Sequence, residues 1–352
     1  MSTIIEVQAE RDYSIKVDVD WLQELGTVLT GYNKVLIIAS QEVSEILDLK
    51  RKLSDFPNAT FFMTPDGEVQ KTIATAEKIW DFLGEKQFSR SDLIVAIGGG
   101  ATTDLGGFVA ATWLRGIPWV AIPTTLAGMV DAAIGGKTGL NSPSGKNLIG
   151  AFNSPQTVLV DLQVLNSLSD RDFRAGLAEV IKSGLIADLE ILRLLQEAED
   201  LTAARALASQ LVSRSAQVKA AVVSSDFKES RLREILNYGH TLGHAIEKHS
   251  NFALRHGEAI AIGLVFAAEL SFLAGSLSAE DVHVHRALLN KFGLPTGYLK
   301  SAWPELLNLM RGDKKVRDAR LRFIGLSKLG EPIWLEEISE SQLVAAYERI
   351  SI

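Results

Sequence analysis

The sequence predicts a two-part fold: an α/β nucleotide-binding domain with a mostly parallel sheet over residues 1–168, then a mainly α-helical domain over residues 169–352. Two patterns predict it. In the first part, apolar strand-like runs alternate with helical segments, an order typical of parallel sheets covered by helices. After Leu168 helical patterns take over. The length of 352 residues also suits about two domains.

The predicted strands of the first part are short apolar runs rich in β-branched residues. A helical segment from Val69 to Phe82 lies between two of them. Parallel sheets bind ligands at the carboxyl ends of their strands, so we expect a ligand site at that edge. The predicted strands are Val35–Ala39, Thr60–Met63, Leu93–Ile97, Trp119–Ile122 and Thr157–Val160.

The second part is predicted as a series of long helices. One hairpin, Leu321–Leu326 with Ile333–Leu335, is the exception. The apolar stretch from Ile260 to Ala274 contains Glu269 and is too short to span a bilayer, so we expect a buried helix. The predicted helices are Arg171–Ala198, Leu201–Val223, Leu232–Lys248, His256–Ala274 and Ala279–Phe292.

Composition narrows the class of protein. The net charge is −7, from 36 basic and 43 acidic residues, which argues against a general nucleic-acid binder. The absence of cysteine excludes disulfides, thiolate nucleophiles and cysteine metal sites, and it fits a reducing compartment. The N-terminus lacks the basic-then-apolar plan of a signal peptide. We therefore expect a cytoplasmic protein with neither a membrane nor a nucleic acid as partner.

A glycine-rich turn, Gly98–Gly107, follows the strand Leu93–Ile97. Glycines allow backbone amides to approach a phosphate, and the N-terminus of a following helix favours its charge. The turn matches neither the Gly-x-Gly-x-x-Gly fingerprint nor a P-loop. Asp66 after the second predicted strand, and Thr124 after the fourth, add a ribose ligand and a hydroxyl at the same edge. Nucleotide binding is the preferred interpretation, and a tight strand-to-helix turn is the alternative.

A second glycine-rich segment spans residues 135–147. It contains two lysines, Lys137 and Lys146, and two amides, Asn141 and Asn147. Lysine binds phosphate as a point charge, and amides add directional donors. We interpret the segment as an anion-binding loop; a solvated basic loop is the alternative.

Three histidines suggest a metal or acid–base centre. His240 and His244 are four residues apart and share a helix face, and His256 opens the next predicted helix. A catalytic zinc usually keeps three protein ligands. Glu179 is the leading carboxylate, because a charge on an apolar helix is costly unless it is paired or bound to metal. A buried pair of Glu179 with Lys182 is the alternative. Spacing alone does not decide which histidines bind metal.

Taken together, the motifs resemble those of the 3-dehydroquinate synthase family over nearly the whole chain. The resemblance implies conversion of 3-deoxy-D-arabino-heptulosonate 7-phosphate to 3-dehydroquinate and phosphate, in the shikimate route to aromatic amino acids. It implies NAD, used and regenerated in each turnover, and one divalent metal, zinc or cobalt. The steps implied are alcohol oxidation, phosphate elimination, re-reduction, ring opening and aldol closure. The matching motifs are Asp66–Lys71, Gly98–Gly107, Pro123–Thr125, Gly135–Gly139, Gly145–Asn147, Gly176–Lys182, Arg233–His244, Arg255–Glu258 and Asp313–Lys315.

The resemblance also implies roles for individual residues. Glu179, His240 and His256 would be the metal ligands. Arg115 resembles a residue offered to a neighbouring subunit, which implies a homodimer. The implied NAD site comprises Asp66, Gly67, Glu68, Val69, Gln70, Lys71, Gly100, Ala101, Thr102, Thr103, Asp104, Thr124, Thr125, Lys137, Lys146, Val164, Leu165, Asn166 and Ser167. The implied catalytic and substrate-binding residues are Arg115, Asp131, Lys137, Lys146, Asn147, Lys182, Lys219, Glu229, Arg233, Asn237, His244 and Lys314.

Three other functions are consistent with parts of this pattern. A metal-dependent polyol dehydrogenase would share the glycine turn and the metal centre, but it would need no phosphate site. A related sugar-phosphate cyclase would act on another heptulose or hexose phosphate; Lys219, Arg233 and Lys314 favour a substrate with a carboxylate. A catalytically inactive binding protein is the third alternative, and the complete set of motif residues argues against it.

Overall fold

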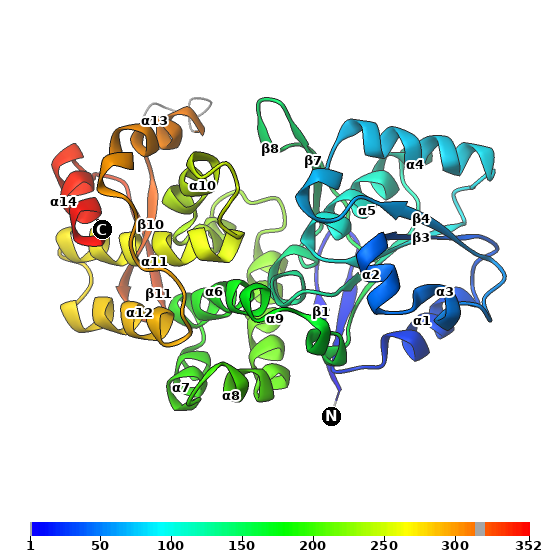
Figure 1. Ribbon diagram of the computed structural model, residues 1–352, viewed down its shortest axis with the longest axis horizontal. Helices are drawn as coiled ribbons and strands as arrows, with labels where there is room; N and C mark the ends of the chain where they lie inside the picture. The colour runs from blue at the N-terminus through cyan, green and yellow to red at the C-terminus, as the bar shows by residue number, and fades with distance from the viewer. Residues whose placement is uncertain (1, 314–320) are drawn as a thin grey trace. The chain divides into compact units, whose positions relative to one another are not determined.

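The computed structural model describes residues 2–313 and 321–352 (Figure 1). The chain forms two compact units. The first comprises Met1–Ser169 with Lys219–Lys228, and the second comprises Asp170–Val218 with Glu229–Ile352. A short segment of the chain thus returns to the first unit after residue 218. The predicted boundary between two domains at residue 168 stays a prediction.

A seven-stranded sheet, in the order β1-β2-β9-β6-β5-β3-β4, forms the centre of the first unit. β1 pairs with β2 in antiparallel fashion, and the remaining pairs are parallel. Every residue of β3, β5, β6 and β9 is buried, as expected when helices cover both faces of a parallel sheet. The strands are β1 Thr3–Val7, β2 Tyr13–Val17, β3 Val35–Ser40, β4 Ala59–Thr64, β5 Leu93–Gly98, β6 Trp119–Pro123 and β9 Thr157–Val160.

Helices lie on both faces of this sheet. Figure 1 shows α4 and α5 on one side and α1 and α3 on the other. Gly106 allows α5 to lie close to the sheet, because a Cβ there would be 2.7 Å from the Cβ of Ala96. The helices are α1 Trp21–Leu29, α2 Gln41–Ile46, α3 Leu49–Lys52, α4 Ile73–Glu85 and α5 Gly100–Thr112, with short turns η1 Gly67–Gln70, η2 Trp113–Arg115, η3 Gly128–Ala132 and η4 Leu162–Ser167.

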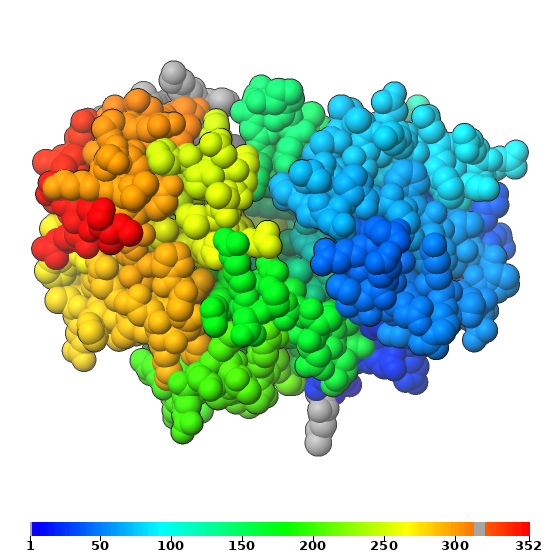
Figure 2. Space-filling model, in the orientation of Figure 1, coloured from blue at the N-terminus to red at the C-terminus, as the bar shows by residue number. Residues whose placement is uncertain are grey.

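The anion-binding loop predicted at residues 135–147 is largely a β-hairpin, so that prediction of a loop was wrong. β7 (Lys137–Ser142) pairs with β8 (Gly145–Phe152) in antiparallel fashion. Gly139 is required by the pairing, since a Cβ there would lie 2.6 Å from the carbonyl oxygen of Ile149. Figure 2 shows the hairpin as a green lobe at the surface of its unit, where Leu148 is 60% exposed.

Helix α11 forms the centre of the second unit and packs against α6, α10, α12 and α14. Among the described residues it is the one helix long and apolar enough to cross a membrane, yet 78% of it is buried inside the protein. It is therefore a core helix, as predicted. The elements are α6 Asp170–Ile186, α7 Leu189–Glu197, α8 Leu201–Ala206, α9 Ala208–Ser225, η5 Leu232–Asn237, α10 His240–His249, α11 His256–Leu273, α12 Ala279–Lys291, η6 Lys300–Ala302, α13 Trp303–Asp313, β10 Phe323–Lys328, β11 Glu331–Leu335 and α14 Glu340–Ile350.

Three predicted long helices are each interrupted. The helix predicted over Arg171–Ala198 is two helices, α6 and α7. Asp188 caps α7 by accepting a hydrogen bond from the amide of Glu190. The stretch from Leu201 divides into α8 and α9. Gly239, with φ of +80°, separates η5 from α10, a backbone conformation that glycine adopts without strain. The five predicted strands, the β10–β11 hairpin and helices α11 and α12 agree with the structure.

Candidate metal centre and sheet-edge site

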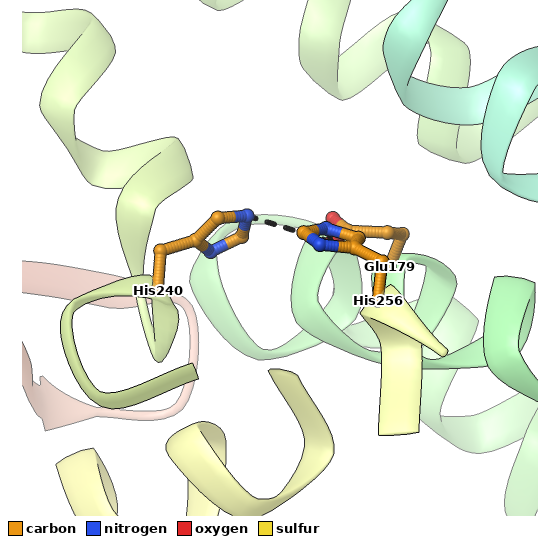
Figure 3. A group of neighbouring side chains, drawn as sticks. All are labelled: Glu179, His240 and His256. Carbon is orange, nitrogen blue, oxygen red and sulfur yellow. Dashed lines mark hydrogen bonds and ion pairs between the residues drawn. The ribbon is translucent and has the colours of Figure 1, made fainter. Parts of the chain in front are cut away.

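Three side chains in the second unit converge on one point. Glu179 comes from α6, and His240 and His256 are the first residues of α10 and α11. Figure 3 shows the three side chains pointing toward one another. One potential ligand atom from each lies within 4.8 Å of the other two. Two imidazoles and one carboxylate form a donor set that suits zinc and other divalent metals, so the residues present fit a metal ion.

Hydrogen bonds fix which ring nitrogens face the carboxylate. The Nε2 atoms of His256 and His240 lie 3.2 and 3.6 Å from Oε1 of Glu179. The Nδ1 atom of His240 lies 3.1 Å from the carbonyl oxygen of Tyr238, and that of His256 lies 3.2 Å from Oε2 of Glu247. Both rings therefore direct the same nitrogen toward Glu179, as metal-ligating histidines do when an acceptor holds the other nitrogen.

Close backbone packing places the two histidines. A Cβ at Gly257 would lie 1.7 Å from the carbonyl oxygen of Ala175, so glycine brings the start of α11 against α6. A Cβ at Gly263 would lie 2.0 Å from the carbonyl oxygen of Gly239, where α10 begins. Because these contacts exclude any side chain, the three ligand-bearing elements approach at backbone distance.

Electrostatics in this cluster favour a charged carboxylate. Burial alone would raise the pKa of Glu179, but the Lys182 ammonium, whose Nζ is 2.5 Å from Oε2, and the two histidines hold that pKa well below its usual value. Burial and the charge of Lys182 lower the pKa of His240 well below the ordinary value. Burial also opposes the charged form of His256, yet hydrogen bonds with Glu179 and Glu247 raise its pKa to about 10.

A second group of potential ligands overlaps the first. His244, Glu247 and His256 also place ligand atoms within 4.8 Å of one another. The rings of His244 and His240 are 5.2 Å apart between centroids. His244 is exposed, whereas Glu179 and His240 are buried. The two groups share His256, so the geometry leaves two alternative metal positions, of which the more enclosed is that of Glu179, His240 and His256.

The carboxyl edge of the sheet in the first unit carries a polar network. Lys71 is buried, and its Nζ donates to Oδ2 of Asp104 at 2.6 Å and to Oδ1 of Asn147 on β8. Asn141 links the hairpin to the edge by donating to Glu68 at 2.7 Å and by accepting from the amide of Asn147. Burial raises the pKa of Asp104, although Lys71 opposes the rise. The network joins the glycine turn, the η1 turn and the hairpin.

Most residues of the implied NAD site lie in loops after the strands of this sheet. Thr124 and Thr125 follow β6, and the amide of Thr124 donates to the carbonyl oxygen of Gly98. Gln70 accepts hydrogen bonds from Thr64 and Thr102, so its side chain links the last residue of β4 to the first turn of α5. Other members lie around η1 after β4, at the start of α5 after β5, and in η4 after β9: Asp66–Lys71, Gly100–Asp104 and Val164–Ser167. Lys137 and Lys146 lie on the β7–β8 hairpin.

The implied substrate residues are distributed over both units. Lys219 belongs to the first unit by its contacts and forms an ion pair of 2.5 Å with Asp131. In the second unit, Asn237 donates to Glu229 at 3.0 Å. Arg233 is also there, fully buried. In the first unit Arg115, Lys137 and Asn147 are exposed and Lys146 is half-buried. In the second unit Lys182 is buried beside Glu179, and His244 is exposed. Lys314 lies outside the described residues.

Sequence reasoning did not identify Glu247 or Tyr238 as part of the cluster. Glu247 had a sequence signal: His240, His244 and Glu247 follow the spacing i, i+4, i+7, which marks one face of a helix. Tyr238 contributes its backbone carbonyl, a contact that no residue identity could have indicated.

Comparisons with known proteins give the family that the chain resembles. Family profiles described as 3-dehydroquinate synthase N-terminal and C-terminal match residues 61–175 and 176–316. A 3-dehydroquinate synthase of Streptomyces avermitilis is 52% identical over 296 residues, 83% of this chain and 81% of that protein.

Two solved structures share the fold at 25% identity. One is a 2-deoxy-scyllo-inosose synthase complexed with carbaglucose-6-phosphate, NAD+ and Co2+, with a TM-score of 0.89 and 99% of each chain covered. The other is a 2-epi-5-epi-valiolone synthase from Streptomyces hygroscopicus with NAD+ and Zn2+ bound, with a TM-score of 0.89 and 98% of each chain covered.

Proposed function

Because the chain belongs to the 3-dehydroquinate synthase family, we propose that it converts 3-deoxy-D-arabino-heptulosonate 7-phosphate to 3-dehydroquinate and phosphate in the shikimate route. The observation that carries the proposal within the structure is the convergence of Glu179, His240 and His256. In this proposal one divalent metal and NAD serve the reaction, and NAD is regenerated in each turnover.

We assign the metal to Glu179, His240 and His256. The bound metal would act as a Lewis acid at a substrate oxygen. The protein's part is to hold the site: the charge of Lys182 lowers the pKa of Glu179 and so favours the ionised carboxylate. The carbonyl of Tyr238 keeps a proton on Nδ1 of His240, which leaves the Nε2 lone pair for the metal.

We assign NAD to the carboxyl edge of the sheet in the first unit. The start of α5 offers amides and a helix N-terminus to a pyrophosphate. Polar groups come from around η1 after β4 and from the first turns of α5 after β5: Asp66, Glu68, Lys71 and Asp104. The two similar cyclase structures contain NAD+, which supports this assignment.

Substrate recognition in this proposal depends on cations and amides. From the family resemblance, we assign Lys137, Asn147, Lys182 and His244 to the phosphate and neighbouring hydroxyls. The carboxylate would be held by Lys219, Arg233 and Lys314, with Glu229 and Asn237 completing the polar network. Phosphate elimination needs little protein base, because the leaving phosphate can itself accept a proton. Most of the protein's contribution to catalysis is then the binding and orientation of the substrate by these side chains.

The test is phosphate release from the heptulosonate phosphate with NAD far below substrate concentration. We expect many turnovers per NAD, no accumulation of NADH, and loss of activity on chelation that Co2+ or Zn2+ restores. Accumulation of NADH in step with substrate loss would instead indicate a metal-dependent polyol dehydrogenase.

A parallel assay separates this function from that of a related sugar-phosphate cyclase. The two similar cyclase structures are 25% identical to the chain, against 52% for the dehydroquinate synthase, which favours the carboxylate-bearing substrate. Replacement of Arg233 with Ala should raise KM for the heptulosonate phosphate. Faster turnover of a hexose or heptulose phosphate without a carboxylate would reject the assignment.

We also propose a cytoplasmic homodimer. Leu114 and Arg115 both have positive φ, +48° and +68°, a strained backbone that non-glycine residues adopt mainly at functional positions. The exposed Arg115 is suited to reach a neighbouring subunit. Sedimentation of the wild type and of R115A tests the dimer: a monomeric wild type would contradict it.

A further inference from the structure

We propose that Glu247 is a positioning residue of the metal centre: its carboxylate accepts a hydrogen bond from Nδ1 of His256, so that Nε2 of that ring presents its lone pair to the metal. The inference rests on the proposed function, because it assumes the metal ligands Glu179, His240 and His256. Nothing in the assignments above uses the side chain of Glu247.

The geometry at His256 supports this role. Oε2 of Glu247 lies 3.2 Å from Nδ1, while Nε2 of the same ring lies 3.2 Å from Glu179. Glu247 is only 4% exposed, and a buried carboxylate is costly unless it is paired. The Glu247 carboxylate lies beside the ring nitrogen of His256 that faces away from Glu179. From that position a carboxylate orients an imidazole and increases its basicity.

The two metal histidines are held by acceptors of different strength. His240 is held by a neutral backbone carbonyl, that of Tyr238, at 3.1 Å. His256 is held by an ionisable carboxylate. Charge-assisted hydrogen bonds are roughly twice as strong as neutral ones, so Glu247 makes His256 the more firmly oriented ligand. The chain therefore compensates for the greater exposure of the His256 side chain, 38% against 11% for His240.

A direct metal contact is the alternative role for Glu247, through the group His244, Glu247 and His256. A neutral imidazole has one lone pair, so His256 can serve that group through Nδ1 or the Glu179 group through Nε2, but not both at once. The more enclosed group, with two buried members, favours Nε2 and leaves Glu247 as the hydrogen-bond acceptor.

The experiment compares E247Q and E247A with wild type and with E269Q as a matched control. Glu269 is also a buried carboxylate, on the same helix as His256, and pairs with Arg286 and Arg349 at 2.8 and 3.3 Å. Thirteen residues along a helix place it about 20 Å from His256. Each full-length protein is stripped of metal and titrated with Co2+ at one fixed pH. The readouts are Kd and the visible absorption of the bound cobalt, with melting temperature as a check of folding.

We expect Co2+ to bind about tenfold more weakly to E247Q and up to about a hundredfold more weakly to E247A. Gln can still accept the Nδ1 hydrogen bond through its amide oxygen, which explains the order. The cobalt spectrum should change in both variants, and E269Q should match wild type in Kd and spectrum. If E247A does not fold, E247Q decides the question.

The outcomes separate the inference from the proposed function. A wild-type protein that binds no Co2+ would reject both. Normal binding by wild type with the same Kd and spectrum in E247Q would reject the positioning role alone. Loss of Co2+ binding in E247Q together with normal binding in E179Q would identify Glu247 as a ligand and overturn the inference.

Discussion

The two units hold their candidate residues in contrasting ways. At the sheet edge of the first unit, polar side chains are bonded to one another: the ammonium of Lys71 is shared by Asp104 and Asn147. In the second unit, Glu179, His240 and His256 direct ligand atoms at a common point. A ligand at the sheet edge must exchange hydrogen bonds among several side chains, whereas a cation at the second site displaces the proton that His256 shares with Glu179. The first arrangement suits a cofactor that is bound reversibly, and the second suits a resident ion.

The largest effect should follow from removing the carboxylate of the metal centre. E179Q loses an anionic ligand and leaves Lys182 buried beside a neutral amide. Metal catalysis contributes several kcal/mol, so kcat should fall on the order of a thousandfold. Metal content after dialysis, together with phosphate release, measures the effect. E269Q is the control, and an E179Q enzyme with full metal content would contradict the assignment.

A smaller effect, on stability, is expected at the sheet edge. K71M leaves Asp104 without its ammonium partner, and breaking such a buried pair costs about 3 kcal/mol. Denaturant unfolding measures the loss, and KM for NAD should rise. The double variant K71M/D104N should recover much of the stability, because no uncompensated charge remains. Metal affinity should stay normal in K71M; a large loss of Co2+ binding would show that the two sites aren't independent.

The smallest predicted effect is a pH dependence of metal uptake. The pKa of His256 is raised to about 10, whereas that of His240 is lowered. From pH 6 to 8 the metal-free protein therefore carries one proton on His256 that the metal must displace, while His240 is already neutral. Metal binding should strengthen about tenfold per pH unit. Competition titrations at three pH values test this: a flat profile would mean that His256 is neutral, and a hundredfold change per unit would mean that two protons are released.

Much of the fold was predictable because hydrophobic pattern determines it. Runs such as Leu93–Ile97 are apolar throughout because both faces of a parallel sheet are covered. The β7–β8 hairpin was missed for the opposite reason. Gly139 and Gly150 are typical of loops, yet here each allows the facing strand to approach. A Cβ at Gly139 or at Gly150 would lie only 2.6 or 2.5 Å from a carbonyl oxygen of the facing strand.

The site was predictable in composition but not in geometry. The residues alone left three histidines as equal candidates for metal ligands, and only the family resemblance selected His240 and His256. The left-handed Gly239 starts α10 at His240, and Gly257 packs the start of α11 against α6. Both are effects of tertiary packing that spacing in the sequence doesn't reveal. Glu247 was within reach of sequence reasoning through its helical spacing from His240.

Glu179, His240 and His256 are proposed to hold one divalent metal, and anomalous scattering from crystals grown with Co2+ would locate that ion. We expect a single strong peak within bonding distance of a Glu179 oxygen and the Nε2 atoms of both histidines. A peak among His244, Glu247 and Nδ1 of His256 instead would contradict it.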